Sequence, residues 1–388
     1  MKRDRAGLVL PVFVLPVLVL LALPCVLPVF AQEKQNFVFN LGSPEGQILQ
    51  SLGQETDDAR KVSLGEEFLS KYPKHEAAGW VAAQVESGLL GQKEYDKVLE
   101  VAEMAYTNTP DMDGAYYALK AAVAKEDPEQ IKKWSARTSE LARKTIAAMG
   151  TPKDDDAKHQ LDYAKEVDEY SEYALYVVAL KAQPKEQVDL VDTLIERNPK
   201  SQYLLLVTST YFNALEKAGE GKKVCPAAEK MSAGASKNAE AMLVAANCSM
   251  VAQKGAGMIT YGNKALEAIN SRTKQEGVSE SEWASQKEGI LANANWDIGV
   301  GYSLEGKYGP ANRALRAALP LLKGNEQLRG ECLFYLGLAN YSLGKAIGDR
   351  GQMRQGMQFF QQAAAVGNPM QEQASRNAKL VLAELGGK

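Results

Sequence analysis

Short runs of helical periodicity, each stopped by a proline or a glycine, constrain this chain more than any other feature. In segment 93–107, apolar residues recur at intervals of three and four, so they fall on one face of a helix. Pro110 follows and ends that helix. A helix this short cannot bury its apolar face alone and needs neighbours on both sides. The same pattern runs to the end of the chain with little strand-type alternation, and it predicts an all-α fold.

The helix ends resemble one another along the chain. An apolar end runs into a proline at Pro73, Pro110, Pro199 and Pro369. The first interval is 37 residues, and the second is 89, near two units of about 44 residues. This period indicates a repeat array of helix pairs. The pattern and its breaks predict helices at 57–71, 75–90, 93–107, 112–125, 128–149, 155–182, 185–197, 201–218, 223–235, 237–253, 256–270, 279–305 (with a break near Gly289), 309–322, 326–343, 350–365 and 370–385.

Two consecutive segments near the C-terminus carry a more specific pattern. Segment 291–322 reads LANANWDIGVGYSLEGKYGPANRALRAALPLL. It places an aromatic residue, a large–small pair, a second aromatic, a turn glycine and a small–large–small series at Trp296, Ile298-Gly299, Tyr302, Gly306, Ala311, Leu315 and Ala318. The next segment repeats the pair at Leu336-Gly337 and the large residue at Phe360. Small residues let helices approach, and large ones such as Leu315 and Phe360 fill the grooves between them.

This pattern resembles the tetratricopeptide repeat (TPR) family, most strongly over 291–369 and across 55–388 as a whole. The resemblance implies a right-handed superhelical solenoid of antiparallel helix pairs over 55–388, in which helix 370–385 is a polar C-terminal cap. It also implies an exported bacterial TPR protein, whose first helices line a concave groove that binds peptides. The family's Lys/Asn/Arg clamp for a terminal carboxylate is not recognisable, because the corresponding positions hold residues such as Trp296, Asp297 and Val300.

The N-terminus predicts export. Residues 1–31 combine a basic start, a long apolar run and a small residue at Ala31, which is the order of a cleaved signal peptide. The rival is an uncleaved membrane anchor, which the four prolines of the apolar run disfavour. A lipoprotein at Cys25 is disfavoured because Pro24 stands where a small residue is needed. Residues 32–54 are expected to be a linker with one short helix, and no later segment is apolar enough to span a membrane.

The sequence offers little material for catalysis or for cofactors. The net charge of −3 leaves no positive excess for a nucleic-acid backbone. The chain has no P-loop, no Gly-x-Ser-x-Gly and no zinc-binding spacing, and its two histidines lie 84 residues apart. We therefore expect no catalytic residues, no cofactor and no metal.

Two cysteines are candidates for a disulfide. Cys225 and Cys248 lie at similar distances on either side of a predicted turn near 235–236, so they fall at nearly the same height on antiparallel helices. An oxidising compartment favours a bridge if their Cβ atoms face each other. Two buried, small and unbridged side chains are the alternative, and both remain open from the sequence.

The aromatic residues are the candidates for binding a partner. Tyr117, Tyr173, Trp296 and Tyr335 lie on helices that come first in their pairs. Tyrosine and tryptophan suit a binding groove because they combine apolar area with a polar tip. The alternative is that they pack between helices.

Three functions follow as hypotheses. The first is a non-catalytic scaffold in the periplasm or at the cell surface that binds a partner protein or peptide on its concave face. The second is a structural subunit of a cell-envelope assembly, and the third is an enzyme with an unrecognised site. The acidic balance favours a neutral or basic partner segment.

Overall fold

The computed structural model describes residues 40–233, 237–274 and 277–386. The predicted signal peptide, 1–31, and the predicted turn at 235–236 lie outside these residues. The described part of the chain is all-helical and contains no strand. Its elements are α1 (Pro44–Gln54), α2 (Asp58–Lys71), α3 (Ala78–Gly91), α4 (Tyr95–Asn108), α5 (Met112–Ala124), α6 (Pro128–Met149), α7 (Asp155–Ala179), α8 (Pro184–Arg197), α9 (Gln202–Lys217), η1 (Gly221–Lys223), α10 (Val224–Met231), α11 (Ala239–Val251), α12 (Gly255–Ser271), α13 (Glu280–Leu304), α14 (Tyr308–Ala318), η2 (Leu319–Leu321), α15 (Glu326–Ile347), α16 (Arg350–Ala364) and α17 (Gln371–Glu384).

Local signals in the sequence set many of these boundaries. The Asp127 side chain accepts hydrogen bonds from the first backbone N–H groups of α6, and Pro128 occupies the first turn. Ser279 and Glu282 form the expected capping box at the start of α13. The expected break near Gly289 is absent, because α13 runs unbroken to Leu304. One glycine inside a helix costs only about 1 kcal/mol, and the packed second half of this long helix offsets that cost.

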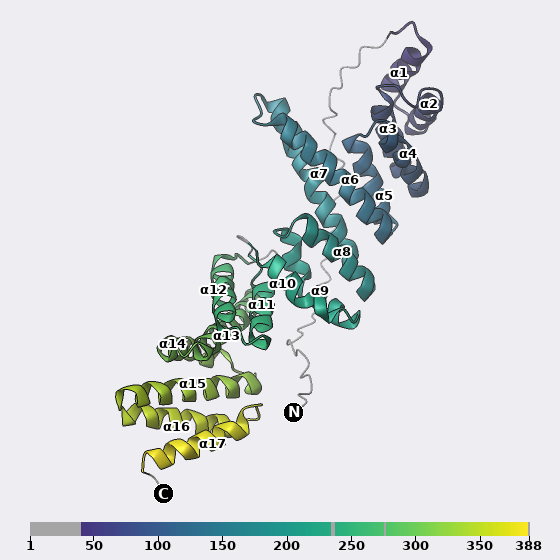
Figure 1. Ribbon diagram of the computed structural model, residues 1–388. Helices are drawn as coiled ribbons and strands as arrows, with labels where there is room; N and C mark the ends of the chain where they lie inside the picture. The colour runs from purple at the N-terminus through teal and green to yellow at the C-terminus, as the bar shows by residue number, and fades with distance from the viewer. Residues whose placement is uncertain (1–39, 234–236, 275–276, 387–388) are drawn as a thin grey trace.

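The helices pack in sequence along an elongated array, with α1 to α4 at one end and α15 to α17 at the other (Figure 1). Each helix contacts the next one in the chain. In addition, every odd-numbered helix from α3 to α17 contacts the next odd-numbered helix. Even-numbered helices of the described chain meet in this way only at α6–α8 and α8–α10. The odd-numbered helices from α3 to α17 therefore form one continuous layer, and the even-numbered helices outside it lie apart except at these two contacts.

Five of the turns from odd- to even-numbered helices, those after α3, α5, α9, α11 and α13, repeat one backbone geometry. Two residues after the helix ends, φ is positive at Lys93, Glu126, Gly219, Gln253 and Gly306. In each turn the next residue donates its backbone N–H to a carbonyl five residues earlier, as Glu94 does to Leu89. This left-handed helix end satisfies carbonyls that the helix leaves unpaired. The turn after α15 uses Gly348 in the same way.

The small–large contacts predicted in the C-terminal segments are confirmed. A Cβ atom added at Gly299 would lie 2.4 Å from Cγ of Leu315, and one at Gly337 would lie 2.6 Å from Cδ1 of Phe360. Both distances are too short for any side chain, so glycine allows α13 to approach α14 and α15 to approach α16.

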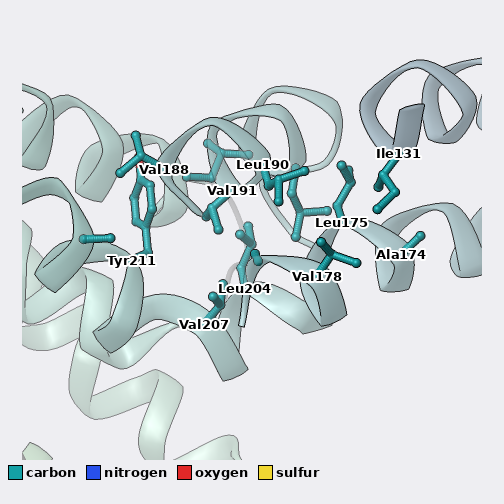
Figure 2. Close-up of a cluster of buried hydrophobic side chains, with 14 of the residues drawn as sticks. Ile131, Ala174, Leu175, Val178, Val188, Leu190, Val191, Leu204, Val207 and Tyr211 are labelled. Atoms are coloured by element: carbon teal, nitrogen blue, oxygen red, sulfur yellow. The ribbon is translucent and has the colours of Figure 1, made fainter. Parts of the chain in front are cut away.

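Apolar clusters succeed one another along the array instead of forming one central core. The largest joins α4 to α11, and Figure 2 shows its part between α6 and α9, where Leu175, Leu190, Leu204 and Tyr211 interdigitate. None of the helices in the described part of the chain has both the length and the apolarity needed to cross a membrane.

Candidate functional site

Six partly buried tyrosines form a continuous row of rings across three odd-numbered helices. We call this row the tyrosine strip. Neighbouring ring centroids lie 5.1–6.5 Å apart, within the range of favourable aromatic pairs. The strip consists of Tyr116 on α5, Tyr163, Tyr170, Tyr173 and Tyr176 on α7, and Tyr203 on α9.

Helix periodicity and the layer of odd-numbered helices together create the strip. On α7 the four tyrosines follow steps of 7, 3 and 3 residues, which keeps them on one side of the helix. Asp154 caps the start of α7 by accepting the N–H of Ala157. The contacts of α7 with α5 and with α9 then bring Tyr116 and Tyr203 against this row.

Polar groups at the strip hold the rings in place. The Tyr163 hydroxyl donates to Oδ1 of Asp113 at 2.7 Å, which ties α7 to the start of α5. The Tyr203 hydroxyl donates to Oε1 of Glu169 at 3.2 Å, which ties α9 to α7. The ammonium group of Lys120 lies 4.0 Å from the centroid of the Tyr116 ring.

Burial raises the pKa of two partly buried phenols of the strip, Tyr116 and Tyr203. It is the main cause that raises the pKa of Tyr116 to about 12, and the nearby carboxylates of Glu166 and Asp113 add to it. The pKa of Tyr203 is also raised to about 12, by burial first and then by Glu169. At neutral pH these side chains therefore offer uncharged ring faces and hydroxyl donors.

The structure separates the four aromatic candidates named from the sequence. Tyr173 lies in the strip, whereas Tyr117 lies beneath Tyr116 and is only 7% exposed. Trp296 is 6% exposed and packs in an apolar cluster with residues of α12, α14 and α15. Tyr335 is partly buried at the edge of that cluster, against Phe334. Tyr117 and Trp296 are therefore packing residues, because neither presents enough area to a partner.

Sequence reasoning missed a buried carboxyl group near the strip. Glu86 on α3 is fully buried, and neither of its carboxyl oxygens has a hydrogen-bond partner among the described residues. It faces Gly114 of α5, where an added Cβ would lie 3.1 Å from Oε2 of Glu86. Burial, followed by the charges of Asp111 and Asp113, raises the pKa of Glu86 well above 4.5. No motif marks this residue, because only the packing of α3 on α5 buries it.

The cysteine pair lies between α10 and α11, away from the strip. The Sγ atoms of Cys225 and Cys248 are 2.09 Å apart, and their Cα atoms are 5.8 Å apart, which is the geometry of a disulfide. Cys332 is buried and unbridged. Among the described residues, no group of three or more His, Cys, Asp or Glu side chains is placed to hold a metal ion.

Comparisons with known proteins assign this chain to no family. No protein-family model matches the chain, and no curated protein matches it.

Proposed function

We propose that this protein is a non-catalytic scaffold of the TPR type, exported to the periplasm or cell surface, that binds a partner protein or peptide segment. Its helix pairs would form a right-handed superhelical solenoid. The continuous layer of odd-numbered helices supports this proposal. Because helices in that layer stay in contact while most even-numbered helices lie apart, the odd-numbered layer would lie on the concave side.

The tyrosine strip is the single observation that carries the proposal. Aromatic side chains on rigid helices contribute binding energy at a small entropic cost, because packing already fixes their rotamers. The raised pKa values of Tyr116 and Tyr203 favour binding over acid–base chemistry, because a general acid or base works best with a pKa near the ambient pH.

A site-specific photo-cross-linker tests the proposal. The mature protein would carry p-benzoylphenylalanine in place of Tyr173, which lies in the strip, and would be irradiated in an envelope extract of its own source. Tyr308 provides the matched control, since it is a partly buried tyrosine on the even-numbered helix α14. We expect one dominant adduct from position 173 and none of the same mass from position 308. The same adduct from both positions, or no adduct from position 173, would contradict the proposal.

A further inference from the structure

The central helix of the strip is strongly acidic. Helix α7 carries seven carboxylates and two lysines, a formal net charge of −5 with His159 neutral. Three of these carboxylates, Asp162, Asp168 and Glu172, form ion pairs with Lys165 or Arg143. The two other carboxylates beside the tyrosines, Glu166 and Glu169, are exposed and have no basic partner among the described residues.

These two carboxylates divide the strip into two similar subsites. In the first, Tyr116 and Tyr170 meet edge to face with centroids 5.1 Å apart, and the charge of Glu166 acts on Tyr116. In the second, the ring centroids of Tyr173 and Tyr203 lie 5.8 Å apart, and Glu169 accepts a hydrogen bond from the Tyr203 hydroxyl. Each subsite therefore combines ring faces with one carboxylate, which is the combination that attracts a cationic side chain.

The chain itself already places a cation on this surface. The Lys120 ammonium lies over the face of Tyr116, 4.0 Å from its centroid, and 5.9 Å from that of Tyr117. A cation within about 6 Å of a ring centroid is attracted by the negative ring face. The first subsite can therefore accommodate a long basic side chain, and Lys120 would compete with a partner for it.

We propose that the tyrosine strip recognises a basic segment of its partner, with arginine or lysine side chains lying on the ring faces near Glu166 and Glu169. This inference rests on the proposed scaffold function and specifies the chemistry of the partner. Charge complementarity carries it, because Glu166 and Glu169 form no ion pair with any described residue. Arginine fits best, since its planar group stacks on aromatic rings while it bonds a carboxylate.

Matched peptides test the chemistry directly. The probes are two fluorescein-labelled peptides of the repeat Arg-Ser-Gly, one with arginine and one with citrulline, the neutral isostere, in its place. Fluorescence anisotropy at low salt would measure their affinity for the mature protein. We expect the citrulline peptide to bind about tenfold more weakly, and the arginine peptide to lose affinity as salt is added. Equal affinities for the two peptides would overturn the proposal.

Three variants locate the binding. The double substitution Glu166→Gln/Glu169→Gln should weaken arginine-peptide binding by about fivefold or more. Its matched control, Glu267→Gln/Glu288→Gln, makes the same charge change at exposed residues of α12 and α13 and should have little effect. Lys120→Gln should strengthen binding by about threefold, because it removes the competing cation. Equal losses in the two double variants, or weaker binding by Lys120→Gln, would refute the assignment.

The cross-linking and peptide-binding experiments together distinguish failure of this inference from failure of the scaffold proposal. Circular dichroism would first establish that each variant keeps its helical signal. If cross-linking at Tyr173 captures a partner but the arginine peptide binds no better than its citrulline counterpart, the scaffold function stands and the basic-partner assignment fails. If the peptide prefers arginine but position 173 captures nothing, the strip binds cations and the scaffold proposal fails.

Discussion

The repeated turns between helices lead to a quantitative prediction about stability. Lys93, Glu126 and Gln253 adopt φ values of 63°, 52° and 55° at positions where equivalent turns use Gly219 and Gly306. A side chain in this left-handed region crowds the backbone, whereas glycine does not. Replacing Lys93 or Gln253 by glycine should therefore stabilise the neighbouring helices. Glu126 is less suitable as a test because it also forms an ion pair with Lys181.

The expected magnitude follows from two opposing effects. A left-handed backbone costs an ordinary L-residue about 1–2 kcal/mol. Glycine loses about 0.5–1 kcal/mol more conformational entropy on folding than alanine does. The net gain is about 0.5–1 kcal/mol at each site. Lys93 and Gln253 lie in different parts of the array, so each gain should appear in the helices beside its own turn.

Native-state hydrogen exchange is the suitable assay, because a helical array opens locally and its unfolding need not be two-state. The opening free energy of amides in α3 and α4 should rise in Lys93→Gly. Lys93→Ala is the matched control, since it removes the same side chain but keeps Cβ, and it should leave that free energy nearly unchanged. Conversely, Gly306→Ala should lower it near α13 and α14 by about 1 kcal/mol. No atom lies within 4 Å of the Cβ added at Gly306, so backbone strain alone would cause that loss. Equal exchange in Lys93→Gly and Lys93→Ala would refute the reasoning.

Four further predictions address other features. Thiol titration of the denatured, unreduced mature protein should find one free thiol, and three free thiols would exclude the disulfide. The variant Cys225→Ser/Cys248→Ser should lose about 3 kcal/mol of stability, because the bridge closes a loop across a separation of 23 residues. Burial raises the pKa of Glu86, so the folded state keeps a proton that the unfolded state loses above about pH 4.5. The free energy of unfolding should therefore fall as the pH rises from there to the folded-state pKa. In Glu86→Gln, urea unfolding at pH 5 and pH 7 should show a smaller fall, and an unchanged fall would argue against this role. Gly337→Ala should cost about 1–3 kcal/mol in thermal unfolding, since its Cβ would lie 2.6 Å from an aromatic ring of α16, and a neutral result would show that the helices can separate freely. Mass spectrometry of protein from its source should find an N-terminus at or within a few residues of Gln32, and an intact first residue on a membrane-bound species would replace export by anchoring.

Local signals explain why the helices could be located from the sequence. The prolines at 73, 110, 199 and 369 all follow helix ends in the structure, because proline cannot donate the next helical hydrogen bond. The predicted caps at Asp127 and Ser279 also form. These signals act within a few residues, so they depend little on tertiary packing. The predicted helix 223–235 fits less well, because α10 ends at Met231.

The equivalence of the turns was hidden from the sequence. Lys93 and Gln253 occupy the same left-handed position as Gly306, yet they carry no glycine to mark it. The burial of Glu86 could not be predicted for a different reason. A single glutamate on an apolar helix is typical of a surface position, and only the packing of a neighbouring helix covers it. Likewise, height along two helices allowed a bridge between Cys225 and Cys248 but could not fix the direction of either side chain.

The sequence by itself determined that the chain is helical, where most helices begin and end, and which small and large residues pair between them, because these properties depend on periodicity and near neighbours. The tertiary structure alone decided which aromatic residues reach the surface. Tyr117 and Trp296 resemble Tyr173 in their sequence setting, yet only Tyr173 lies in the strip. The physical reason is that the exposure of a side chain depends on which other helices cover it, and those helices lie tens of residues away along the chain.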